Sequence, residues 1–181
     1  MKIIDLKDAA GKALKDQAWE LYETSFPHYE RWGKEAFDRA SLDERFHTKL
    51  LVNDSGDLMA LVYYWTYGEF LYVEFLAVNH SMRGQNIGSE IIGKLIEENP
   101  GRRILLEIDP PIDGISIRRL HFYERLGFLA NGYEHIHPSY VSGDEVHPHL
   151  LVVMTHGGTI TSNEFMGFRT FLLSILETYG D

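Results

Sequence analysis

The sequence predicts an α/β fold in which one domain, residues 1–181, contains a mixed, mostly antiparallel sheet of six to seven strands flanked by helices on both faces. Three observations predict this fold. Three strand-like runs rich in aromatic and β-branched residues follow one another over residues 45–78, as in an antiparallel meander. A helix-like segment then separates two strand-like segments, which is the order of a β-α-β crossover. Two later strand-like segments complete a core of about residues 1–155, and a helical extension over about residues 160–180 closes the chain.

The composition indicates a protein that needs no disulfide to fold and is suited to a reducing compartment. The chain of 181 residues is 44% hydrophobic and contains no cysteine, which also excludes thiolate chemistry. No stretch approaches the roughly 18 apolar residues of a membrane span, so we expect a cytoplasmic protein with no membrane partner. The formal net charge of −10 opposes nucleic-acid binding and is compatible with a cationic or amine-bearing substrate.

The first half of the chain contains two helix-like and three strand-like segments. Residues 8–26 have an amphipathic helical pattern, and "KEAFDRAS" forms a short second helix after the break at "SFPHYERWG". The three strands are "RFHTKLLV", "LMALVYYWTY" and "EFLYVEFLAV", and the turn "NDSGD" joins the first two. This order predicts two helices packed on a meander.

The second half begins with a helix over residues 89–98, which the breaker "NPG" ends. The strand "RRILLEID" and the helix "SIRRLHFYERL" follow, and Gly127 suits a left-handed cap at the end of that helix. "FLANGYEHI" and "HLLVVMTH" are predicted as two strands. The closing helix is expected to be capped by Ser162 and is too apolar to be free in solvent. It therefore packs on the core or on a second copy of the chain, which leaves a homodimer open.

A glycine-rich loop precedes the helix of residues 89–98 and has the properties of an anion-binding site. In "MRGQNIG", Gly84 and Gly88 allow a close approach of the backbone, Asn86 tolerates a left-handed conformation, and Arg83 suits phosphate oxygens. A solvated loop with a helix cap is the alternative. The sequence contains no GxxxxGK[ST], and "GQNIGS" is not GxGxxG. A nucleotide-binding oxidoreductase would need a Rossmann repeat, which the chain lacks.

This loop resembles a motif of the GCN5-related N-acetyltransferase (GNAT) family, [RQ]-x-x-G-x-[GA]. Arg83 and Gly88 match the motif, and Asn86 stands where the family usually has glycine. The resemblance implies that the loop holds the pyrophosphate of acetyl-coenzyme A (acetyl-CoA).

A second segment, "RRLHFYERLGF", resembles the family's helix that ends in Tyr-x-x-x-Gly-Phe. Tyr123, Gly127 and Phe128 match it, and Ser116 stands where the family often has a cofactor-binding asparagine. The resemblance covers about residues 1–155. It implies that acetyl-CoA is the co-substrate and that free backbone amides of one strand reach its acetyl and pantetheine groups. The residues assigned to acetyl-CoA are Leu76, Ala77, Val78, Arg83, Gly84, Gln85, Asn86, Ile87, Gly88, Ser89, Ser116 and Arg119.

The resemblance implies an acyl-CoA-dependent N-acyltransferase that transfers acetyl directly to a primary amine of a small molecule or a peptide. It makes Tyr123 the acid for the leaving thiolate, although Tyr123 alone reads as a buried aromatic residue. Glu74 and Glu107 are the candidate bases because each is a lone carboxylate in an apolar strand, where a structural hydrogen-bonding role is the alternative. Alternation places Glu74 on the strand face of Leu76 and Val78. A non-catalytic coenzyme A-binding module is the alternative function.

Two His-x-His pairs lie in the late hairpin, within "EHIHPSY" and "EVHPHLL". This spacing puts two imidazoles on one strand face, but the prolines interrupt both strands, and we expect no metal site. In the resembling family, loops at this place shape the acceptor pocket. The expected acceptor-binding residues are Tyr133, His135, His137 and Tyr140.

Overall fold

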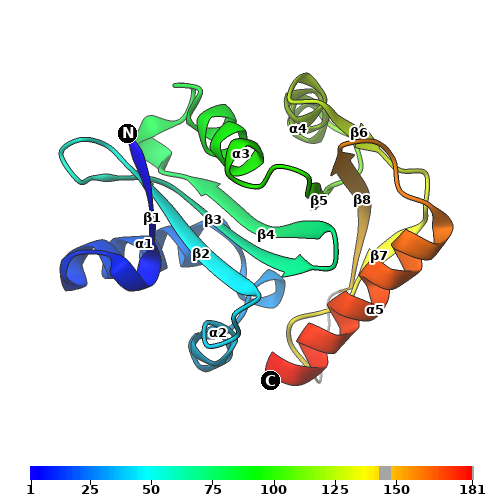
Figure 1. Ribbon diagram of the computed structural model, residues 1–181, viewed down its shortest axis with the longest axis horizontal. Helices are drawn as coiled ribbons and strands as arrows, with labels where there is room; N and C mark the ends of the chain where they lie inside the picture. The colour runs from blue at the N-terminus through cyan, green and yellow to red at the C-terminus, as the bar shows by residue number, and fades with distance from the viewer. Residues whose placement is uncertain (143–147, 181) are drawn as a thin grey trace.

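The computed structural model describes residues 1–142 and 148–180, which form an eight-stranded sheet with helices on both faces (Figure 1). The strand order is β1-β2-β3-β4-β5-β8-β6, and β7 also pairs with β8. The strands are β1 (Lys2–Asp5), β2 (Phe46–Val52), β3 (Leu58–Tyr67), β4 (Phe70–Val78), β5 (Arg103–Ile108), β6 (Phe128–Ala130), β7 (His135–His137) and β8 (His149–His156). The helices are α1 (Gly11–Ser25), α2 (Lys34–Ala40), α3 (Ile87–Glu98), α4 (Gly114–Arg125) and α5 (Ser162–Tyr179), with short 3₁₀ helices η1 (Leu6–Asp8), η2 (His28–Glu30) and η3 (His80–Met82).

The sheet is mixed and mostly antiparallel, which confirms the predicted fold class. The pairing of β4 with β5 is parallel and the other strand pairs are antiparallel. The strand count exceeds the predicted six to seven because β1 was not expected and the predicted strand over residues 128–136 is divided into β6 and β7. Asn131 lies where that strand divides, and its side-chain nitrogen donates to Thr155 Oγ1 at 3.0 Å while its side-chain oxygen accepts from the Ile160 amide at 2.9 Å.

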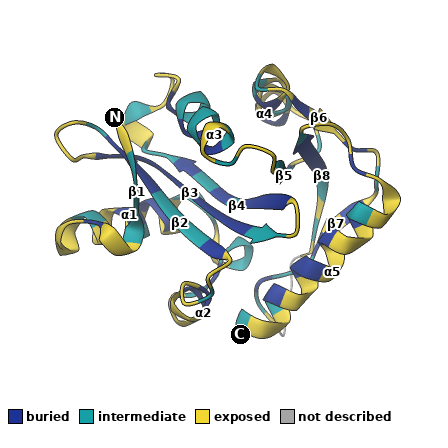
Figure 2. Cartoon of the chain, viewed as in Figure 1, coloured by how far each residue is buried: buried dark blue, intermediate teal, exposed yellow. Residues whose placement is uncertain are grey.

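Two buried clusters lie on opposite faces of the sheet, because alternate residues of β3 belong to different clusters. The cluster that we call the α5-side core joins Tyr63 and Trp65 of β3 to α1, α2 and α5. The α3-side core joins Val62 and Tyr64 to α3 and α4. Figure 2 shows the buried strands between these helices, whose outer sides are exposed. None of the helices in the described part of the chain has the length and apolarity to cross a membrane.

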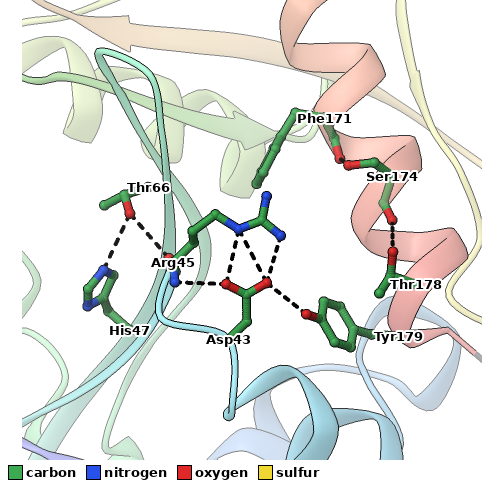
Figure 3. Close-up of polar contacts among 8 residues, drawn as sticks. All are labelled: Asp43, Arg45, His47, Thr66, Phe171, Ser174, Thr178 and Tyr179. Carbon is green, nitrogen blue, oxygen red and sulfur yellow. Dashed lines mark hydrogen bonds and ion pairs between the residues drawn. The ribbon is translucent and has the colours of Figure 1, made fainter.

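The closing helix α5 packs on the sheet of its own chain, which is the first of the two possibilities that the sequence left open. Its buried side chains include Phe168 and Leu172 in the α5-side core. At its end the Tyr179 hydroxyl donates to Asp43 Oδ2 at 2.7 Å, and Arg45 binds the same carboxylate (Figure 3). The capping residue is Thr161 rather than the predicted Ser162; it forms a reciprocal capping box with the third residue of the helix.

Strand β4 carries a bulge at Glu74. Tyr63 of β3 pairs with Phe75 and Tyr64 pairs with Val73, so Glu74 has no residue opposite it. A bulge breaks the alternation of side chains and redirects the ones beside it. This local irregularity decides the surroundings of Glu74.

Strands β4 and β5 diverge after a short parallel pairing. Residues 70–73 pair with residues 103–106, and Val73 opposite Leu106 is the last pair. Glu74 and Glu107 are the next residues of their strands. We call this point the fork; from there to Val78, β4 pairs only with β3 among the described strands.

Candidate functional site

A cavity of about 930 Å³ opens at the fork. Residues from β4, β5, α4, the start of α3 and the segment after β7 line it, so both sequence motifs and both buried carboxylates face one space. Phe26 and Glu30, next to and within η2, also border it. The predicted site residues that line the cavity are Glu74, Leu76, Ala77, Val78, Arg83, Gly84, Asn86, Ile87, Gly88, Glu107, Arg119, Tyr123, His137 and Tyr140.

The 83–89 segment has the backbone that an anion-binding turn needs. Gly84 has φ +78° and Asn86 has φ 63°, both in the left-handed region. Asn86 immediately precedes α3, and in the described part of the chain its side chain forms no capping hydrogen bond, which leaves the first amides of the helix to another acceptor. At Gly88 a Cβ would lie 3.2 Å from the Phe122 ring, so glycine allows α3 to approach α4 closely. With Arg83 on the cavity wall, this arrangement suits a phosphate group.

Glu74 is held by two hydrogen bonds from uncharged donors. The Tyr140 hydroxyl donates to Oε1 at 2.7 Å, and Trp65 Nε1 donates to Oε2 at 2.7 Å. Burial raises the pKa of Glu74 to about 7, although these two bonds act to lower it. The carboxyl group is therefore close to half-ionised near neutral pH, as a general base requires.

The bulge overturns the predicted orientation of Glu74. Leu76 and Val78 pack against the α3-side core, whereas Glu74 lies with Trp65 and Tyr140, which belong to the α5-side core. Alternation would have placed all three β4 side chains on one face. The extra residue at the bulge shifts the alternation by one position, so Glu74 falls on the opposite face.

Glu107 is surrounded by three aromatic side chains. His135 Nε2 bonds to its Oε1, the Tyr72 hydroxyl donates to its Oε2 at 2.7 Å, and His137 Nε2 lies 3.8 Å from Oε2. Burial raises the pKa of Glu107, but His137, His135 and Tyr72 together hold that pKa below its ordinary value. Glu107 is therefore ionised under conditions in which Glu74 is partly protonated.

Tyr123 lies in α4 between Phe122 and Phe128, with ring centroids 5.0 and 5.5 Å away. Its side chain is buried in the α3-side core and borders the cavity. Burial raises the pKa of its phenol to about 12. The hydroxyl therefore keeps its proton at neutral pH, which is the state that a proton donor needs.

Comparison with known proteins agrees with this geometry. The profile of the Acetyltransferase (GNAT) family matches residues 13–128, more than half of the chain. The chain belongs to this family.

Individual relatives of this GNAT protein are similar over different parts. Putative acetyltransferase YjbC of Bacillus subtilis (strain 168) is 28% identical over 103 residues, which are 52% of this chain and 53% of that protein, so the match spans about half of this relative. A putative acetyltransferase from the GNAT family from Bacteroides thetaiotaomicron has a structure with a TM-score of 0.84 and 27% identity, covering 100% of this chain and 99% of that one. An aminoglycoside 6′-N-acetyltransferase complexed with coenzyme A has a TM-score of 0.58 and 19% identity, covering 89% and 100%, and shows likeness of fold alone.

Five predicted site residues of this GNAT protein do not line the cavity. Gln85 is exposed and Ser89 is half-buried on α3. The Ser116 hydroxyl forms hydrogen bonds within the cap of α4, where it accepts from the Asp113 amide at 3.0 Å. The remaining two, Tyr133 and His135, pack behind the residues that line the cavity. Tyr133 stacks on Phe165 and His135 is fully buried behind Glu107.

Sequence reasoning missed several residues that border the cavity. Tyr72 holds Glu107, yet it appears in the sequence as one more aromatic residue of an apolar strand. Glu30 comes from the break after α1, and its Oε1 lies 3.3 Å from Nε2 of His149. His147, which forms a His-x-His pair with His149 in the sequence, lies outside the described residues. Among the side chains that the structure describes, no group of three or more His, Asp or Glu residues is arranged to hold a metal ion.

Proposed function

We propose that this GNAT protein transfers an acetyl group from acetyl-CoA directly to a primary amine of a small molecule or a peptide. The observation that carries the proposal is the single cavity at the fork, which joins the 83–89 segment to Glu74 and Tyr123. A binding site for an anion, a base near neutral pH and a protonated phenol therefore face the same space.

The 83–89 segment fits the diphosphate of coenzyme A. Its left-handed residues, its uncapped helix amides and Arg83 provide donors to phosphate oxygens within an otherwise acidic protein. A coenzyme A complex of a structurally similar acetyltransferase supports the same ligand here. Leu76, Ala77 and Val78 border the cavity on a stretch of β4 that pairs only with β3, so their strand can offer backbone amides to the acyl end of that ligand.

Two side chains then move protons. Acetyl-CoA, when bound, supplies the thioester carbonyl carbon that the amine nitrogen attacks. Glu74 accepts the proton of the acceptor ammonium on a carboxylate oxygen, which its pKa of about 7 permits. As the carbon–sulfur bond breaks, Tyr123 donates its phenolic proton to the departing sulfur, and its burial keeps that proton in place until charge develops. The second proton that the nitrogen loses on becoming an amide returns Tyr123 to its phenol form.

The proposal is tested by thiol release from acetyl-CoA across a panel of amines, with coenzyme A binding measured in parallel by thermal shift. We expect amine-dependent thiol release and a higher Tm with coenzyme A. Tight coenzyme A binding without turnover of any amine would identify a non-catalytic coenzyme A-binding module instead.

A matched pair of tyrosine variants tests the acid role. We expect Tyr123→Phe to lower kcat by about 100-fold, the lower end of general acid catalysis. Tyr64→Phe is the control, because Tyr64 is buried in the same α3-side core and burial also raises its pKa to about 12. Equal kcat values for the two variants would remove Tyr123 from the reaction.

A further inference from the structure

Glu107 is a buried carboxylate at the wall of the cavity, and the mechanism proposed above does not use it. It lies at the fork beside Glu74, and Glu30 also lines the cavity. The arginines that line the cavity, Arg83 and Arg118 among them, come from the 83–89 segment and from α4. Two carboxylates, those of Glu74 and Glu107, therefore lie at the fork.

His135 does not neutralise Glu107. Its Nε2 bonds to Glu107, while its Nδ1 is buried next to the rings of Phe165 and Phe168 and has no hydrogen-bond partner among the described residues. A second proton would place an unpaired N–H in this apolar environment, at the cost of an unsatisfied buried donor. The partners therefore assign His135 as a neutral imidazole that donates from Nε2.

His137 approaches Glu107 without forming a hydrogen bond. Its Nδ1 lies 2.6 Å from the Pro138 carbonyl oxygen, which can only accept, so Nδ1 carries a proton. Its Nε2 is 3.8 Å from Glu107 Oε2, beyond hydrogen-bond range. Both side chains border the cavity. His137 Nε2 and the charged oxygen of Glu107 thus face the same small gap.

We propose that Glu107 is the counter-ion for the ammonium group of the acceptor, which enters the gap between Glu107 and His137 before its proton passes to Glu74. A primary ammonium has three donors, and one of its N–H groups can point to Glu107 Oε2. Tyr72 and His135 are positioning residues, since their bonds fix the carboxylate. This inference rests on the proposed acetyl transfer and specifies, in addition, that the acceptor binds as a cation.

The same arrangement selects against amino acids. In an amino acid, a carboxylate accompanies the ammonium group, and at the fork it would lie near Glu74 and Glu107. Like charges in a desolvated site are strongly disfavoured. The acceptor class is therefore a cationic amine that has no carboxylate beside its nitrogen.

The test compares 2-phenylethylamine with phenylalanine, which differ by that carboxylate. We expect the wild type to acetylate the amine in preference. In Glu107→Gln, we expect KM for the amine to rise by roughly 10- to 100-fold, the range for losing a hydrogen bond to a charged group, with kcat within about threefold of wild type. Glu98→Gln, which removes an exposed charge at the end of α3, is the control. A fall in kcat at constant KM in Glu107→Gln would overturn the proposal, because Glu107 would then act in the chemical step.

A binding measurement keeps the proposal testable without turnover or folding of the variant. With coenzyme A present, calorimetry on the wild type compares 2-phenylethylamine with 2-phenylethanol, and we expect the amine to bind at least about tenfold tighter. Equal affinities would overturn the proposal. If no amine is acetylated but Glu107-dependent ammonium binding persists, the proposed function fails and this inference stands. If amines are acetylated and Glu107→Gln changes neither KM nor binding, only this inference fails.

Discussion

Glu74 and Glu107 both line the cavity at the fork and are opposite in acid–base behaviour. Both accept hydrogen bonds from a tyrosine, but Glu74 has an indole N–H as its other donor, whereas Glu107 has an imidazole and a second histidine nearby. The pKa of Glu74 is raised and that of Glu107 is lowered. Two carboxylates whose pKa values diverge in this way are suited to different roles, one exchanging a proton and the other keeping its charge.

The pH dependence of turnover tests the role of Glu74. The base must be ionised, so kcat/KM of the wild type should rise with pH through a midpoint near 7. An acceptor amine titrates near 10, which separates its contribution from that of Glu74. We expect Glu74→Gln to lose the limb near 7 and to lower kcat/KM by about 100-fold. Steady-state rates over a pH series measure both effects. An unchanged limb in the variant would assign it to another group.

The sequence predicted the kind of surroundings that Glu74 needs better than the face of the sheet on which it lies. A lone carboxylate in an apolar strand indicates a partner or a cleft, and the structure supplies both. Its face was predicted wrongly because the bulge depends on how β4 pairs with β3, which local sequence does not encode. The same limit applies to Tyr72, whose contact with Glu107 joins residues 35 positions apart.

Among the elements, the turn into α3 has the backbone conformation that most restricts the choice of residue. The glycines and Asn86 of the 83–89 segment indicated this turn, because few other residues adopt left-handed φ values. Helix and strand order was also predicted from the apolar periodicity. Strand β1 was missed because "KIID" is short and has no alternation that marks a strand, and its pairing with β2 provides the missing information.

A pair of glycine variants tests whether this turn serves the ligand. Gly84→Ala and Gly56→Ala both place a side chain at positive φ, +78° and +87°, without a steric contact. Each should lower stability by about 1 kcal/mol for that reason. Only Gly84 lines the cavity, so only Gly84→Ala should raise KM for acetyl-CoA and reduce the thermal shift with coenzyme A. Thermal melts and steady-state kinetics distinguish the two. Equal KM values would contradict a role of the 83–89 segment in binding.

At the scale of the whole molecule, the site is built into one of the two cores. Trp65 and Tyr140, which hold Glu74, belong to the α5-side core together with Phe168 of α5. His135, which holds Glu107, lies against the same Phe168 ring. The carboxylates are therefore held by residues of a packed core, and because burial disfavours its charged form, ionising Glu74 must oppose folding.

The stability of the whole chain should therefore depend on pH through Glu74. Its native pKa of about 7 is above the ordinary 4.5, so the native state binds more protons than the unfolded state between these values. Stability from this group is greatest below about 4.5 and falls as pH rises through 7, by about 3 kcal/mol in total. Glu74→Gln lacks this dependence. We expect urea unfolding to show the variant about 3 kcal/mol more stable than wild type at pH 8, with the difference vanishing near pH 4.5. The same variant should lose turnover, so a gain in stability at pH 8 would show that Glu74 is retained for activity although it destabilises the fold. A loss of stability at pH 8 would mean instead that the core stabilises the ionised form of Glu74.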